Sequence, residues 1–97
     1  KLLPADGYQT IHSFSVPFMA IDKAQHVNNA MYMRWIMNSL NESDAKRNIK
    51  CVDISYIHET KMSDTIDIQH IQADDNTHCF RLNNSAGTAM LCNIVLE

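Results

Sequence analysis

The sequence contains no apolar run of the length that a membrane span requires. A transmembrane helix needs roughly 20 consecutive, predominantly apolar residues. Every apolar stretch among these 97 residues is far shorter. We therefore predict that the chain does not span a membrane.

An excess of basic residues is also missing. The chain has 8 Lys and Arg against 11 Asp and Glu, which gives a formal net charge of −3. Proteins that bind the phosphate backbone of nucleic acids show a basic patch or stripe, whereas the basic residues here are scattered. The charge pattern therefore argues against nucleic acid as a partner.

Paired cysteine motifs are absent as well. The number of cysteines is odd and no two of them have CxxC spacing, which favours a reduced, cytoplasmic setting over a disulfide framework. They are Cys51, Cys79 and Cys92. Four histidines likewise lack the spacing of metal ligands, namely His12, His58, His70 and His78. We expect neither a metal site nor another cofactor.

Low-complexity segments and internal repeats are not present either. A chain of this length forms one small domain, which buries only roughly 60–65% of the surface that the unfolded chain exposes. Residues 1–7, KLLPADG, contain Pro4 and Gly7 and are predicted to be a linker. Residues 8–97 are predicted to form the domain. Because the chain begins with Lys1, we expect its start to be a domain boundary.

Hydrophobic periodicity predicts one helix and five strands. Residues 30–40 are apolar over most of a helical circumference, which indicates a buried helix. The predicted strands show a period of two and span 8–18, 49–60, 65–73, 78–83 and 88–96. Short connections favour antiparallel neighbours. The predicted fold class is α+β, with an antiparallel sheet wrapped around one central buried helix.

Polar side chains gather in the loop directly ahead of this helix, at Asp22, His26, Asn28 and Asn29. The first N–H groups of a helix lack intrahelical partners, and the helix dipole leaves partial positive charge there. An oxygen that develops negative charge is stabilised at such a place. A carboxylate and an imidazole beside it suit attack of water on an acyl group, and the apolar helix would line a slot for an apolar tail.

Two segments carry a more specific resemblance. Residues 22–35 read DKAQHVNNAMYMRW, and residues 52–60 read VDISYIHET. Together with KLLP at residues 1–4, they resemble the C-terminal half of the acyl-acyl-carrier-protein (acyl-ACP) thioesterases of plants and bacteria. The resemblance implies a hotdog fold. It also implies hydrolysis of fatty acyl thioesters, above all acyl-ACP, to free fatty acids in fatty acid biosynthesis.

The same resemblance assigns expected roles to three residues, and the position of two asparagines at the helix N-terminus suggests a role for them as well. Asp22, His26 and Glu59 match the catalytic positions of the family. Glu59 or Asp22 would be the general base on water, and His26 would hold the water or the thioester. Asn28 and Asn29 are expected to bind substrate, because the N–H groups near them would receive the oxyanion. No cofactor is needed.

Three positions depart from the family pattern. Ala24 replaces the loop asparagine, Ala20 replaces an aspartate found in many members, and Thr60 replaces the cysteine of plant members. A mechanism through Cys, His and Asn is therefore excluded. Reduced or lost activity is compatible with these changes, and Thr60 is predicted to be an ordinary strand residue.

Structural roles for the same residues remain open. Asp22 could brace the loop, His26 could order it, and Glu59 could be a solvated acid at a strand end. Asn28 and Asn29 are also good helix caps.

Two other functions also stay open. One is a catalytically silent hotdog half, which binds acyl thioester or supports an active half. The other is a hotdog thioesterase or dehydratase that acts on acyl-CoA. Many hotdog thioesterases carry a carboxylate on the central helix, but residues 30–40 contain none. The expected partners are acyl carrier protein and a second hotdog domain, either in the same chain or in a homodimer.

Overall fold

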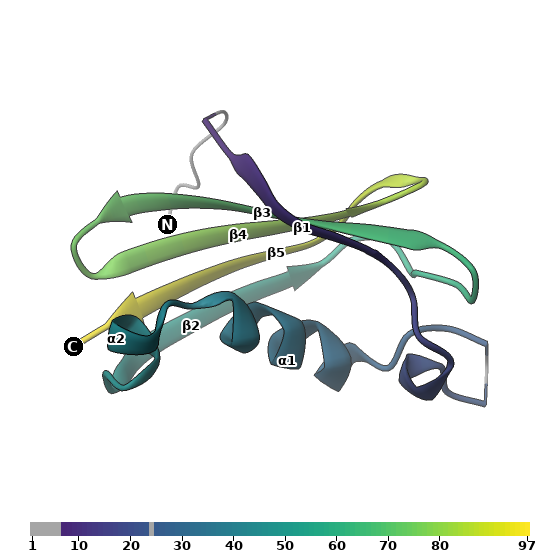
Figure 1. Cartoon of the computed structure of the whole chain (residues 1–97), viewed down its shortest axis with the longest axis horizontal. Coiled ribbons are helices and arrows are strands. Elements are labelled where there is room, and N and C mark those ends of the chain that lie inside the picture. Colours follow the sequence, from purple (N-terminus) through teal and green to yellow (C-terminus); the bar gives the residue numbers. More distant parts are fainter. Residues whose placement is uncertain (1–6, 24) are drawn as a thin grey trace.

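The computed structural model describes residues 7–23 and 25–97 (Figure 1). The predicted linker therefore lies outside the described residues except for Gly7, and Ala24 also lies outside them. The elements follow one another as β1 (Gln9–Ser15), the 3-10 helix η1 (Phe18–Ala20), α1 (Asn29–Ser39), α2 (Glu42–Ala45), β2 (Ile49–Tyr56), β3 (Thr65–Asp74), β4 (Thr77–Asn84) and β5 (Gly87–Leu96).

The five strands form one antiparallel sheet with the order β1-β3-β4-β5-β2. Strands β3, β4 and β5 are joined by tight hairpins, whereas β1 and β2 lie at opposite edges. The chain crosses from one edge to the other through α1, which lies against one face of the sheet (Figure 1). The predicted α+β class, with one helix packed on an antiparallel sheet, is confirmed.

The core lies between α1 and this face of the sheet. Alternate residues of the strands point toward the helix, as a strand period of two requires. The core residues of α1, β3, β4 and β5 are Tyr32, Ile36, Ile66, Ile68, Phe80, Leu82, Met90, Cys92, Ile94 and Leu96. Each large apolar side chain that is fully buried contributes about 1.5–3 kcal/mol. This packing fixes the N-terminus of α1 relative to the strand ends.

Helix α1 begins after Asn28, whose side-chain oxygen accepts a hydrogen bond from Ala30 N at 2.9 Å. Asn28 is therefore the N-cap. Only Tyr32 and Ile36 of the helix are fully buried, while Met33 and Trp35 are half-buried. The sequence predicted burial over most of the helix, but the sheet covers one side only. The other side remains partly exposed in this chain.

The connections differ most from the prediction. The first strand ends at Ser15, because Pro17 has no N–H to donate to a ladder. The segment 41–48 contains the short helix α2, which is capped by Asn41 at 2.7 Å from Asp44 N. The strand predicted for 49–60 ends at Tyr56, so residues 57–60 leave the ladder.

Among the described residues, no helix is both long enough and apolar enough to cross a membrane.

Candidate active site

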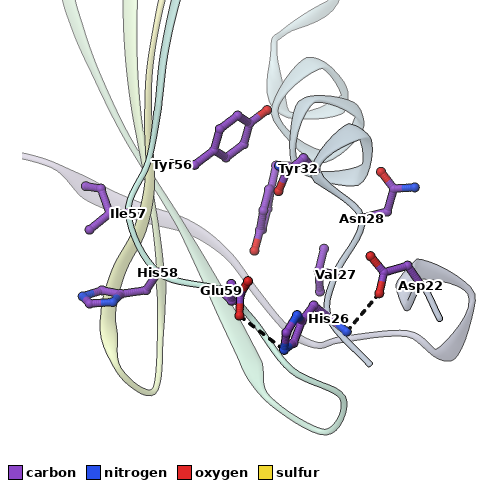
Figure 2. A pocket seen from close by; sticks show the side chains of 10 residues that line it. Asp22, His26, Val27, Asn28, Tyr32, Tyr56, Ile57, His58 and Glu59 are labelled. Carbon is purple, nitrogen blue, oxygen red and sulfur yellow. Dashed lines mark hydrogen bonds and ion pairs between the residues drawn. The ribbon is translucent and has the colours of Figure 1, made fainter. Parts of the chain in front are cut away.

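The loop between η1 and α1 is a tight turn, and backbone hydrogen bonds join its two ends. Asp22 N donates to His26 O at 2.9 Å, and Gln25 N donates to Asp22 O at 3.1 Å. Gln25 has a positive φ of 66°, which such a turn requires. The Asp22 carboxylate also accepts from His26 N at 3.2 Å (Figure 2). Asp22 therefore braces the loop through one of its oxygens.

A second contact joins this loop to the segment after β2. His26 Nε2 lies 3.3 Å from the Glu59 carboxylate oxygen Oε2 (Figure 2). The His26 side chain is 31% exposed and the Glu59 side chain 71%. The backbones also meet, since Val27 N donates to Thr60 O at 2.8 Å. The structure thus brings Asp22, His26 and Glu59 together from two separate segments.

The contact places the His26 ring nitrogen Nε2 against the Glu59 carboxylate oxygen Oε2. A carboxylate oxygen accepts hydrogen bonds, so Glu59 would orient an imidazole that carries its proton on Nε2. The second oxygen of Glu59 lies on a largely exposed side chain. A water molecule can reach it.

A cavity of about 500 Å³ opens at this place, a size typical of small-molecule sites. Its walls include all five residues predicted for the site, as well as Tyr32, Tyr56, Ile57 and His58 (Figure 2). The polar groups come from the loop and the segment after β2, and the rings of Tyr32 and Tyr56 come from α1 and β2. The cavity therefore combines a polar end with aromatic walls.

The helix N-terminus offers fewer free donors than the sequence suggested. Asn28 N donates to Ala20 O at 2.9 Å, and Ala30 N donates to the Asn28 side chain. The Asn28 backbone N–H is therefore already occupied and does not face an oxyanion in this conformation. The backbone N–H of Asn29 has no acceptor among residues 7–23 and 25–97. Of these three groups, it is the one for which the described residues supply no acceptor.

The departures from the family pattern have different surroundings. Ala20 is 1% exposed, and its carbonyl receives the Asn28 N–H, so a small apolar side chain fits that place. Thr60 is fully buried, and its hydroxyl accepts hydrogen bonds from Tyr32 and Asn84. The prediction of Thr60 as an ordinary strand residue was wrong, because β2 ends at Tyr56.

Asn84 was not singled out by sequence reasoning. The only local signal was its place in the turn that begins at Asn83 and ends at Gly87. No pattern in the sequence connects this turn to Thr60, which lies 24 residues earlier.

His58 lines the cavity, whereas the other three histidines outside the predicted site lie elsewhere. His70, His78 and Asp44 form a hydrogen-bonded chain between β3, β4 and α2, and His12 lies on β1. Among the described residues, no group of three or more His, Cys, Asp or Glu side chains has an arrangement that could hold a metal ion.

Solved structures similar to this chain include acyl-ACP thioesterases and a protein in complex with CoA. An acyl-ACP thioesterase from Bacteroides thetaiotaomicron matches with a TM-score of 0.86 at 15% identity, over 92% of this chain and 37% of that one. The 12:0-ACP thioesterase from Umbellularia californica matches with a TM-score of 0.85 at 14% identity, over 100% of this chain and 38% of that one. A Staphylococcus aureus protein in complex with CoA matches with a TM-score of 0.76 at 17% identity, over 93% and 76% of the two chains.

These likenesses establish the fold, which is the predicted hotdog. The chain spans less than two fifths of the length of the two acyl-ACP thioesterases. No curated protein sequence is significantly similar to it. The family model of the acyl-ACP thioesterase C-terminal domain matches residues 4–93, which is nearly the whole chain. The chain therefore belongs to the acyl-ACP thioesterase C-terminal domain family.

Proposed function

We propose that this domain carries the catalytic groups of a thioester hydrolase that releases fatty acids from acyl-ACP. The observation that carries the proposal is the pairing of His26 with Glu59 at 3.3 Å in the wall of a cavity beside the N-terminus of α1. A positioned base, a positioned imidazole and a free backbone N–H are the parts that acyl transfer to water requires. Membership of the family supports the substrate class.

In the proposed mechanism, Glu59 is the general base and His26 orients it. The Nε2–H of His26 holds one carboxylate oxygen, and the other oxygen accepts a proton from water. The water oxygen forms a bond to the thioester carbon, and the carbonyl oxygen becomes an oxyanion that the Asn29 N–H stabilises. The carbon–sulfur bond then breaks, and the protonated Glu59 returns the proton to the leaving thiolate. No further reactant is consumed.

Asp22 has a supporting role in this proposal. One of its oxygens accepts the His26 backbone N–H, so it shapes the loop that carries the imidazole. Asp22 also lines the cavity. Its replacement should therefore weaken the activity by displacing His26.

We also propose that a second hotdog domain packs along β2. This strand pairs with β5 on one side only among the described residues, and its Ile54 and Tyr56 are 37% and 49% exposed. An open apolar strand edge is a template for pairing with another strand. Because β2 leads directly to Glu59, a domain in this place would also extend the walls of the cavity and offer room for the acyl chain.

The test is thiol release from acyl-ACP by the complete protein, with acyl-CoA as a comparison substrate. Glu59→Gln should lower kcat/KM by about 10²–10⁴-fold, the usual contribution of a general base. A matched control is Glu42→Gln, which changes an exposed glutamate on α2 and should leave the rate unaltered.

The catalytically silent half is the rival function, favoured by Ala20, Ala24 and Thr60 in place of family residues. If the complete protein releases no thiol and still binds acyl-ACP, that rival replaces the enzyme. Faster release from acyl-CoA than from acyl-ACP would instead contradict the proposed carrier.

A further inference from the structure

Thr60 is a fully buried polar residue between two exposed ones. Its own exposure is 0%, while Glu59 and Lys61 on either side are exposed. Its hydroxyl oxygen Oγ1 accepts from Tyr32 Oη–H at 2.8 Å and from Asn84 Nδ2 at 2.9 Å. A buried hydroxyl with two such partners joins the elements that carry them, here α1 and the β4–β5 hairpin.

The orientation of the Asn84 amide is fixed by the hairpin. Ala86 N donates to Asn84 Oδ1 at 2.8 Å, and a backbone N–H cannot accept. The amide nitrogen Nδ2 must therefore face the other way. There it donates to both Thr60 Oγ1 and the Glu59 carbonyl oxygen, the latter at 3.1 Å. Asn84 thus clamps the backbone of the segment that carries Glu59.

Tyr32 supplies the anchor on the helix. It is 2% exposed, and burial raises its pKa above the ordinary value, an effect that its hydrogen bonds with Thr60 only partly offset. The phenol therefore stays protonated at neutral pH and remains a donor to Thr60. Loss of the Thr60 hydroxyl would leave the buried Tyr32 O–H and the partly buried Asn84 amide without this acceptor.

Thr60 also touches the catalytic loop through its backbone. Its carbonyl accepts the Val27 N–H at 2.8 Å, directly after His26, and Lys61 pairs with His26 in a short β-bridge. The Glu59 side chain is 71% exposed, so the packing around the carboxylate is sparse. The distance between Glu59 and His26 consequently depends on where the backbone of residues 59–61 is held.

We propose that Thr60 is a positioning residue, whose hydroxyl, held by Tyr32 and Asn84, keeps the Glu59 carboxylate beside the His26 ring. The catalytic part of this inference rests on the proposed function. Thr60 does not touch the substrate in this scheme, and its effect is exerted through Glu59. Misplacement of a catalytic group by about 1 Å can cost about 10²-fold in rate. The hydroxyl should therefore matter to kcat more than to KM.

The first experiment compares Thr60→Val, Thr60→Ser and Thr77→Val in the complete protein, by thiol release from acyl-ACP. Valine keeps the size of threonine and removes the hydroxyl, whereas serine keeps the hydroxyl. Thr77 is a buried threonine at the start of β4 and serves as the matched control. We expect Thr60→Val to lower kcat about 10- to 100-fold with little change in KM. Thr60→Ser should restore most of the rate, and Thr77→Val should retain all of it.

A double-mutant cycle separates positioning from general damage to the fold. If Thr60 acts through Glu59, Thr60→Val should cost much less in a Glu59→Gln background than in the wild-type background. Equal losses in both backgrounds would overturn the proposal. If Thr60→Val does not fold, Tyr32→Phe removes one of the two donors to Thr60 and keeps the ring, and the same cycle is run with that variant.

A second readout does not depend on activity. In protein labelled with ¹⁵N-histidine, Glu59→Gln should change the ring nitrogen shifts of His26, because the Nε2–H loses its ionised acceptor. We expect this change to be strongly reduced when Thr60 is already valine. A full response of His26 in the Thr60→Val protein would overturn the positioning role. The labelling experiment decides this point even if the wild-type protein releases no thiol, a result that would count against the proposed function alone.

Discussion

The imidazole of His78 donates from Nε2 to the Asp44 carboxylate at 2.9 Å, and so joins β4 to α2. Burial raises the pKa of Asp44, but hydrogen bonds from Arg47 and Asn41 and the contact with His78 outweigh it and hold this pKa below its usual range. With Asp44 ionised, His78 Nδ1 accepts from His70 Nε2 at 2.8 Å. Helix α2, which carries Asp44, lies at the opposite end of α1 from the loop between η1 and α1 (Figure 1).

This arrangement predicts a loss of stability in mild acid. Burial, followed by the neighbouring His78, lowers the pKa of His70 below its ordinary value of 6.5, although Asp44 acts in the opposite direction. The unfolded chain therefore binds a proton at His70 at a higher pH than the folded chain does. The free energy of unfolding should fall as the pH drops below about 6.5 and level off below the folded pKa. His70→Gln should flatten this dependence in urea unfolding, whereas His12→Gln on β1 should preserve it.

The three cysteines should differ sharply in reactivity. Burial, with smaller contributions from Asp53 and Cys79, raises the pKa of Cys92 to about 12. Cys79 is buried as well, whereas Cys51 is exposed. Because the thiolate is the reactive form, iodoacetamide should modify only Cys51 in the native protein and all three thiols in urea. Mass spectrometry of the labelled peptides checks this. Modification of Cys92 in the native state would contradict the burial seen here.

The contact between α1 and the sheet should dominate the stability of the domain. Ile36 has an exposure of 0% in the centre of α1. Ile36→Ala removes three carbon atoms from a packed interior and should lower the free energy of unfolding by about 2–5 kcal/mol. Asn38→Ala on the exposed side of the same helix should change it by no more than about 0.5 kcal/mol. Denaturant titration of both variants measures the difference.

Sequence patterns predicted the elements well where packing follows a simple period. The alternation of Phe80 and Leu82 with Cys79 and Arg81 indicated a strand, and the structure has that strand as β4, although Cys79 is buried as well. The polar loop from Asp22 to Asn29 was also recognised as unusual. In contrast, the ends of the strands depend on single hydrogen bonds and turns, which have no periodic signal. The segment after Tyr56 was therefore misread as strand.

The relation of Thr60 to Asn84 shows where prediction from sequence stops. The two residues are 24 positions apart, and their contact exists only because the β4–β5 hairpin folds against the segment after β2. Neither residue type is unusual in its local context, since threonine suits a strand and asparagine suits a turn. By comparison, Glu59 could be associated with His26 beforehand through the family motif. A resemblance to a known family can predict that residues far apart in the sequence share a site, whereas composition and periodicity cannot.

Ala24 stands where the resembling family has an asparagine, and restoring that side chain should accelerate the reaction. Loss of one well-placed polar group from an acyl-transfer site typically costs about 10²–10³-fold in rate, or about 3–4 kcal/mol. Ala24→Asn should therefore raise kcat for thiol release from acyl-ACP, with little change in KM, because the added contact would act mainly in the transition state. Gln25→Asn, a neighbouring substitution in the same loop, is the matched control and should bring no gain.

If Ala24→Asn leaves kcat unaltered while Glu59→Gln abolishes the activity, the hydrolysis proceeds without the family's asparagine. If both variants are as inert as the wild type, the silent-half function is the correct one.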